Sequence, residues 1–158
     1  MRNVLRVTAL VLAFGSAAST VQAGCSTVGD ASAIAQRMIA TTNQFRRSLG
    51  LGQVRLSSAL NKAASAYACE MATTGNFGHV GRNGSTVKTR VSKSGYGRAC
   101  VIAENIAWGY QENAVMQGWE TSAKHRANMT HRKVKEIGIG VAYNGTTPYW
   151  VMTLASKC

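Results

Sequence analysis

The spacing of hydrophobic residues changes along this chain, and the change limits the fold classes open to it. In the first half, apolar residues recur at every third or fourth position, as on one side of an α-helix. The segments Ile137–Tyr143 and Tyr149–Leu154 are instead prone to form strands, and a slightly long loop containing Asn144 and Gly145 joins them. Helices followed by a terminal hairpin predict an α+β fold rather than a parallel sheet.

Four helices are expected from this spacing and from residues that cap helices. Their expected limits are Asp30 or Ser32 to Gly50, Ser57 or Ser58 to Gly75, Thr86 to Ser94, and Asn113 through Trp119. The apolar stretch Val101–Trp108 is interrupted by Glu104 and Asn105, which are the polar residues of that stretch.

The N-terminus has the three parts of a secretory signal peptide. Arg2 and Arg6 form a basic region, a short apolar run ends near Phe14, and small residues lead to Ala23. The apolar run is shorter than the roughly 20 residues of a membrane-spanning helix. We therefore predict a signal peptide over residues 1–23, cleaved after Ala23, a single domain over residues 24–158, and no transmembrane segment.

The predicted exported part contains four cysteines, and an even number in such a chain indicates two disulfides. The residues are Cys25, Cys69, Cys100 and Cys158. Three pairings are possible; we expect Cys69–Cys100 and Cys25–Cys158, the second of which would join the two ends of the domain. A lipid anchor on Cys25 is the less favoured alternative, because Gln22 stands where a lipoprotein signal has an aliphatic residue. The wide spacing of the cysteines argues against a cysteine-based zinc site.

The chain is strongly basic, with a formal net charge of +12. Loss of residues 1–23 removes two arginines and no acid, which leaves +10. Such a charge attracts nucleic acid, anionic lipid or anionic cell-wall polymer, or is simply a solvated surface. The absence of a basic motif interleaved with aromatic residues argues against specific nucleic-acid binding. We interpret the basic run around His131 as exposed surface.

Several motifs follow one another in the order found in a known family. They are Asn43-Gln44-Phe45-Arg46 with Gly50 and Leu56; Leu60, Ala63, Ala64, Tyr67 and Ala68; Phe77-Gly78-His79; Ala103-Glu104-Asn105-Ile106-Ala107; Trp119 with Ser122, His125, Arg126 and Asn128; and Ile137-Gly138-Ile139-Gly140-Val141 with Tyr149-Trp150. Over about residues 38–155 the chain resembles the bacterial form of the CAP superfamily, which comprises cysteine-rich secretory proteins, antigen-5 proteins and plant pathogenesis-related proteins.

The resemblance implies a CAP-type three-layer α-β-α sandwich with a central, largely antiparallel sheet. It also implies a cleft in which the family collects two histidines and two acids. His79, Glu104 and His125 stand at matching positions. Ser122 occupies the position of the second acid, and Glu120, two residues earlier on a helix, should point elsewhere. The chain is therefore expected to have three of the four family residues and a hydroxyl.

Two neutral imidazoles and a carboxylate are ligands that suit a divalent metal, zinc above all. With His79, Glu104 and His125 as ligands, an open fourth position would hold an activated water. A metal-free alternative uses Glu104 as general base and a histidine to polarise a substrate. Each residue also has a purely structural alternative. His79 could cap backbone groups, Glu104 could bind the loops together, and His125 could begin a helix or pack. No residue is assigned as catalytic, because Ser122 lacks the G-x-S-x-G context of a nucleophile.

Three functions are consistent with these features. The favoured one is a secreted or periplasmic, non-catalytic binding module for lipid or another apolar or anionic cell-envelope ligand, since the family is linked to sterol and lipid binding. The first alternative is a metal-assisted hydrolase or peptidase that uses the His-Glu-His cleft. The second is a disulfide-stabilised structural or antagonistic effector that acts by surface contact. We expect the protein to be a monomer.

Overall fold

The computed structural model describes residues 30–158 of the chain. The expected signal peptide, its cleavage site after Ala23 and the first cysteine, Cys25, lie outside the described residues. The elements follow in the order α1 (Ala31–Ser48), β1 (Arg55–Leu56), α2 (Ser58–Thr74), α3 (Val87–Lys93), β2 (Ala99–Trp108), α4 (Glu112–Thr121), α5 (Ala123–Met129), β3 (Glu136–Asn144) and β4 (Thr147–Lys157).

The four strands form one sheet in the order β1-β3-β4-β2. β4 pairs antiparallel with both β3 and β2, and the two-residue strand β1 pairs parallel with β3. The expected largely antiparallel sheet is thus confirmed. The hairpin turn is shorter than expected: Asn144 pairs with Thr147, which leaves two residues in the turn. Gly145 has φ 57°, a conformation that glycine adopts without steric cost.

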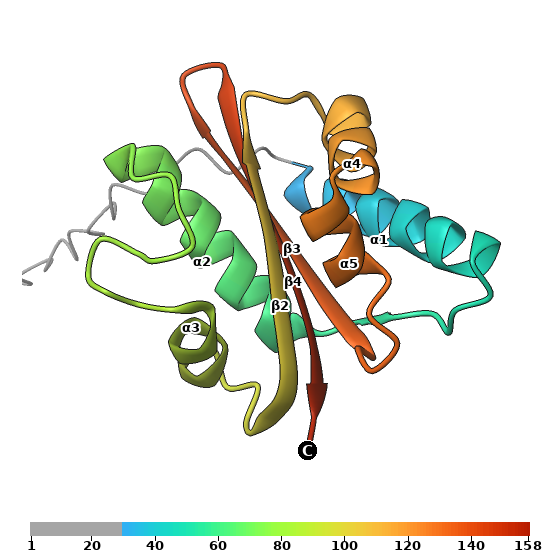
Figure 1. Cartoon of the computed structure of the whole chain (residues 1–158). Helices are drawn as coiled ribbons and strands as arrows, with labels where there is room; N and C mark the ends of the chain where they lie inside the picture. The colour runs from blue at the N-terminus through green and yellow to red at the C-terminus, as the bar shows by residue number, and fades with distance from the viewer. Residues whose placement is uncertain (1–29) are drawn as a thin grey trace, which may run out of the picture.

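Helices cover both faces of the sheet, which confirms the α+β, three-layer architecture. In Figure 1, α1, α4 and α5 lie on one side of the sheet and α2 and α3 on the other. One core cluster joins Met38, Met116 and Trp119 of the first set of helices to Ile139 of β3. On the opposite face, α2 packs on β3 and β4 through small and aromatic side chains. None of the helices in residues 30–158 is long and apolar enough to cross a membrane.

Two glycines of β3 allow α2 to lie directly on the sheet. A Cβ atom on Gly138 would lie 2.1 Å from the carbonyl carbon of Leu60, and one on Gly140 would lie 2.3 Å from that of Ala64. Successive strand residues point to opposite faces, so the intervening Ile139 faces the α1 side. The alternation of isoleucine and glycine in β3 thus gives one face side chains to bury and leaves the other face bare for a helix.

The predicted helix limits are correct for α1, α2 and α3. Ser57 caps α2 by accepting a hydrogen bond from the backbone N–H of Leu60, and Gly75 ends that helix with φ 68°.

The start of α4 was predicted too late: the helix is capped at Gln111, not Asn113. Glu112 occupies the first turn, where a carboxylate is favoured by the helix dipole. Its two oxygens also accept hydrogen bonds from Arg37 of α1, each at 2.7 Å.

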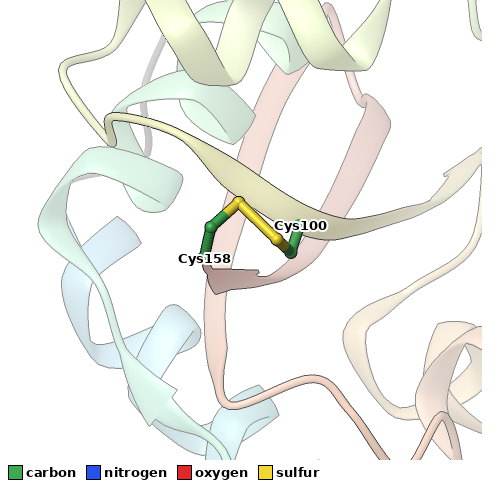
Figure 2. The surroundings of a disulfide bond; sticks show 2 residues. All are labelled: Cys100 and Cys158. Carbon is green, nitrogen blue, oxygen red and sulfur yellow. A yellow bond between two sulfur atoms is a disulfide. The ribbon is translucent and has the colours of Figure 1, made fainter.

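The expected disulfide pairing is wrong. Cys100 is bonded to Cys158, with 4.8 Å between their Cα atoms (Figure 2). The reason is the antiparallel pairing of β2 with β4, which places Ala99 beside Lys157 and so brings the start of β2 to the end of the chain. The register of the two strands therefore decides which cysteines pair, and the spacing of cysteines in the sequence does not reveal that register. None of the cysteines in the described part of the chain is free.

Candidate functional site

A cleft of about 510 Å³ opens at the end of β2, between the loop that follows α2 and the junction of α4 and α5. Its inner wall is apolar and includes Ile106 of β2 and Val115 and Trp119 of α4. The buried faces of these residues belong to the core, so the wall is held in place by the packing of the sheet. The indole of Trp119 additionally donates a hydrogen bond to the carbonyl of Ile106 at 3.4 Å.

Three exposed aromatic side chains line the mouth of the cleft. Phe77, Trp108 and Tyr110 are 43%, 52% and 51% exposed, respectively. The ring centroids of Phe77 and Trp108 are 6.2 Å apart, and Trp108 stacks on Tyr149 at 6.5 Å. We call Phe77, Trp108 and Tyr110 the aromatic rim. Three exposed aromatic rings thus lie beside a concave surface, which is how ligand sites of soluble proteins are commonly built.

Polar side chains stand at the other end of the same cleft. Its lining includes His79 from the loop after α2, Ser122 from the junction of α4 and α5, and His125 from α5. Burial lowers the pKa of His125, and the charge of a protonated His79 lowers it further. Glu120 is not part of the lining, and its backbone carbonyl accepts a hydrogen bond from Arg126 at 3.4 Å.

Glu104 of β2 lies behind this lining and is almost fully buried. One carboxylate oxygen is 2.9 Å from Nδ1 of His79. Arg90 of α3 donates from Nη2 to both carboxylate oxygens, at 3.0 and 2.8 Å. The side chains of Glu104 and Arg90 are 3% and 9% exposed, so this ion pair is shielded from water. Glu104 therefore orients His79 while its own charge is compensated.

Arg90 is a member of this cluster that the sequence analysis missed. Its guanidinium lies 3.4 Å from the ring centroid of Tyr67 and donates to the carbonyl of Ser85 at 2.8 Å and to that of His79 at 3.2 Å. The Tyr67 hydroxyl donates to the carbonyl of Gly78. Arg90 and Tyr67 thus hold the loop that carries His79. The signal in the sequence was weak: a cation next to Val91, in a helix with one apolar face.

The polar residue that follows Glu104 serves the opposite layer. Asn105 donates to the backbone carbonyl of His125 at 3.1 Å, and its side-chain oxygen accepts from Asn128 at 2.8 Å. Because neighbouring residues of a strand point to opposite faces, Asn105 contacts α5 whereas Glu104 contacts α3. Asn128 also donates to the Glu104 carbonyl, at 3.1 Å. This network fixes α5, and with it His125, against β2.

This geometry does not fit the expected zinc site. Within residues 30–158 no three His, Cys, Asp or Glu side chains are arranged to hold a metal ion. His79 and Glu104 are in contact, but both oxygens of Glu104 are bonded to Arg90, whose positive charge opposes a cation at the same place. His125 lines the same cleft as His79 but comes from α5. The residues present therefore do not fit a metal ion bound by His79, Glu104 and His125 together.

The first sequence motif has a structural role. Asn43 of α1 exchanges two hydrogen bonds with the backbone of Val54, at 2.9 and 2.8 Å. Arg46 is 1% exposed and donates to the carbonyls of Gly52 and Met129 at 2.7 and 2.6 Å. These bonds join the end of α1 to the segment before β1 and to the end of α5. The motif thus fixes α1 against α5, the helix that carries His125 into the cleft.

Comparison with known proteins agrees with this fold. The sequence profile of the cysteine-rich secretory protein family, called CAP, matches residues 39–154. The chain therefore belongs to the CAP family. A direct comparison of sequences finds no significant match among curated proteins.

Solved structures of bacterial proteins share the fold at low sequence identity. An outer surface protein of Borrelia burgdorferi superposes with a TM-score of 0.72 at 20% identity, over 78% of this chain and 92% of that one. An extracellular protein of Bacillus anthracis that contains an SCP domain gives 0.75 at 21% identity, over 84% of this chain and 45% of that one. A cysteine-rich secretory protein of Staphylococcus aureus gives 0.68 at 19% identity, over 83% and 40%. This chain thus spans less than half of the latter two proteins.

Proposed function

We propose that the protein is an exported, non-catalytic binding module whose cleft takes a single-chain amphiphile of the cell envelope. The observation that carries the proposal is the aromatic rim, three exposed rings around a concave apolar wall. Export is supported by the N-terminal signal pattern and by similar proteins described as an outer surface protein and an extracellular protein.

The two ends of the cleft suit the two ends of an amphiphile. An alkyl chain against the rim and the inner wall would remove apolar surface from water on both partners, at roughly 25 cal/mol for each Å². His79, Ser122 and His125 at the other end offer hydrogen bonds to a head group. A negatively charged head group is favoured, because the exported chain carries a formal charge of +10 after loss of residues 1–23.

The surroundings of Glu104 support binding rather than catalysis. A general base needs a carboxylate that is free to accept a proton from the substrate. Glu104 is instead buried beneath the cleft lining and bonded through both oxygens to Arg90. It is placed to hold His79, and the hydroxyl of Ser122 stands where the family has its second acid. Among residues 30–158, no Asp or Glu side chain lines the cleft together with the two histidines.

Tryptophan fluorescence gives a direct test. Trp108 is half-exposed in the rim, whereas Trp119 of the inner wall and Trp150 are each 1% exposed, so a ligand that covers the rim should change the emission of Trp108 most. We expect lysophosphatidylglycerol, titrated below its critical micelle concentration, to shift this emission to shorter wavelength with saturation. Lysophosphatidylcholine, which is zwitterionic, should bind more weakly.

A matched pair of variants separates the cleft from exposed apolar surface in general. Trp108→Ala removes the fluorescent reporter itself, so binding by Trp108→Ala and by Leu56→Ala is measured by calorimetry. Both residues are 52% exposed, but only Trp108 lines the cleft. Loss of binding in Trp108→Ala and unchanged binding in Leu56→Ala are expected. Equal losses, or no binding of lysolipids of any chain length by the unaltered protein, would overturn the proposal.

A further inference from the structure

Three segments that are distant in sequence meet at the β1 edge of the sheet. The buried Arg46 at the end of α1 donates to the carbonyls of Gly52 and Met129, and so links α1 to the segment before β1 and to α5. The backbone N–H of Arg55 donates to the carbonyl of Lys135 at 3.0 Å, which joins β1 to the loop between α5 and β3. Figure 1 shows this loop and the α1–β1 segment close together beside α5.

Exposed cations gather along this edge. We call them the basic edge, and they are Arg47, Arg55, Arg126, Arg132, Lys133 and Lys135. The guanidinium of Arg126 lies 4.8 Å from the ring centroid of Phe45, which places α5 over the end of α1. Among residues 30–158, the only Lys or Arg side chains that form ion pairs with carboxylates are Arg37 and Arg90. The charge of the basic edge is therefore available to a partner.

Two exposed leucines lie among these cations. Leu49, just after α1, is 40% exposed, and Leu56 of β1 is 52% exposed. Leu56 and Arg47 line the same shallow hollow of about 360 Å³ against α1. An apolar side chain beside several cations is the combination that binds the interface of an anionic bilayer, where the charges meet phosphate groups and the apolar group enters the acyl boundary.

We propose that the basic edge is a docking surface for an anionic phospholipid bilayer. Each cation close to such a membrane raises partitioning by about fivefold. Six cations at one edge, none of them in an ion pair with a carboxylate of residues 30–158, thus give reversible binding that weakens with salt. Leu49 and Leu56 distinguish a bilayer from other polyanions, because they gain nothing from a fully hydrated polymer.

Nucleic acid fits this surface less well than a bilayer. Binding of single strands relies on aromatic rings on which bases stack. The exposed aromatic side chains Phe77, Trp108 and Tyr110 all line the cleft, and the exposed apolar side chains of the basic edge are leucines. The proposal goes beyond ligand binding in the cleft, since it concerns a separate surface: α5 places His125 in the cleft and Arg126 on the basic edge.

The test measures sedimentation of the purified, exported chain with vesicles. With vesicles of phosphatidylglycerol and phosphatidylcholine in equal amounts, at low salt, the protein should sediment, and it should stay in solution with phosphatidylcholine alone. The double variant Arg132→Gln/Lys133→Gln should weaken partitioning roughly 25-fold. The control Lys88→Gln/Lys93→Gln removes two exposed cations from α3, on the other side of the sheet, and should change it much less.

A second pair of measurements identifies the bilayer as the partner. Leu49→Ser/Leu56→Ser should weaken vesicle binding but leave any retention on heparin unchanged. Trp108→Ala should leave vesicle binding intact, so failure of the cleft proposal and of this one are distinguishable. Equal losses in the Arg132/Lys133 and Lys88/Lys93 variants would overturn the proposal, since they would mean binding by diffuse net charge. Tighter binding to duplex DNA than to the anionic vesicles at the same salt would also overturn it.

Discussion

Arg90 donates from one nitrogen to both carboxylate oxygens of Glu104, at 3.0 and 2.8 Å, beneath the wall of the cleft. The two side chains come from α3 and β2 and are nearly buried. Each charge therefore depends on the other, because an unpaired charge in such a place is costly. The same carboxylate orients His79 at 2.9 Å, so this ion pair connects the stability of the fold to the position of a cleft residue.

Removal of one charge of this pair should destabilise the protein more than removal of both charges together. We expect Arg90→Met to lower the free energy of unfolding by about 3–5 kcal/mol, since it leaves Glu104 buried without its partner. Arg90→Met/Glu104→Gln should recover part of that loss. Urea denaturation of the two single variants and the double variant forms the required cycle. Strictly additive losses would show that the two residues are not energetically coupled.

The glycines of β3 give a second prediction. Gly140→Ala places a methyl group 2.3 Å from the Ala64 carbonyl carbon, so α2 must move away from the sheet. We expect a loss of about 1–3 kcal/mol or more, as for other overpacked cores. Gly52→Ala is the matched control, because a Cβ there has no neighbour within 4 Å. Thermal unfolding should show a lower Tm for the first variant and little change for the second. Similar shifts in both would contradict the close packing of α2 on β3.

Local features of the sequence were sufficient for much of this fold. Caps and periodicity predict α2 from Ser57 to Gly75 because the helix end needs a side-chain acceptor and a left-handed residue at those places. The expectation that Ser122 faces the cleft came from the family resemblance, whereas the expectation that Glu120 points elsewhere rests on local geometry, the 100° step of a helix. The hairpin was predictable because its two strand-prone segments are close in sequence and are joined by a turn signal, Asn144-Gly145.

Features that depend on contacts distant in sequence were not predictable. β1 has two residues and exists only because the backbone of β3 pairs with it. Arg90 acquires its role from Glu104, Tyr67 and the His79 loop, none of which lies on its own helix. The resemblance to the family drew attention to His79, Glu104 and His125; His79 and His125 line one cleft, and Glu104 contacts His79. The resemblance did not show that both oxygens of Glu104 accept hydrogen bonds from Arg90, whose positive charge opposes a metal ion at this place.

The disulfide between Cys100 and Cys158 is expected to be a main source of stability. It closes a loop with a sequence separation of 58 residues, for which the loss of chain entropy in the unfolded state corresponds to about 4 kcal/mol. Cys100→Ser/Cys158→Ser should lose an amount of this order in urea denaturation.

Peptide mapping without reduction checks the same bond chemically. It should yield one linked peptide pair containing Cys100 and Cys158. The remaining cysteines of the sequence, Cys25 and Cys69, are then expected in a second pair. A peptide linking Cys69 to Cys100 would contradict the register of β2 and β4, because that register fixes the position of Cys100 next to the end of the chain.

The histidines of the cleft predict a stability that depends on pH. Burial lowers the pKa of His125 in the folded state below its ordinary value of about 6.5, so between the two values the unfolded chain binds more protons than the folded one. Stability from this site is therefore complete above about pH 6.5 and is lost as pH falls through the lower, folded pKa. We expect His125→Gln to lose less stability than the unaltered protein between pH 7 and pH 5.

An exposed histidine provides the matched control for this prediction. His131→Gln should retain the pH dependence of the unaltered protein, since His131 is solvent-exposed outside the cleft. Titration of the imidazole protons by NMR gives the pKa of His125 directly, and His79→Gln should raise it because the charge of His79 is a second cause of the shift. A His125 pKa above 6.5 would mean that a protonated imidazole is stabilised in the cleft, and an anionic head group would then bind by an ion pair rather than by hydrogen bonds to neutral side chains.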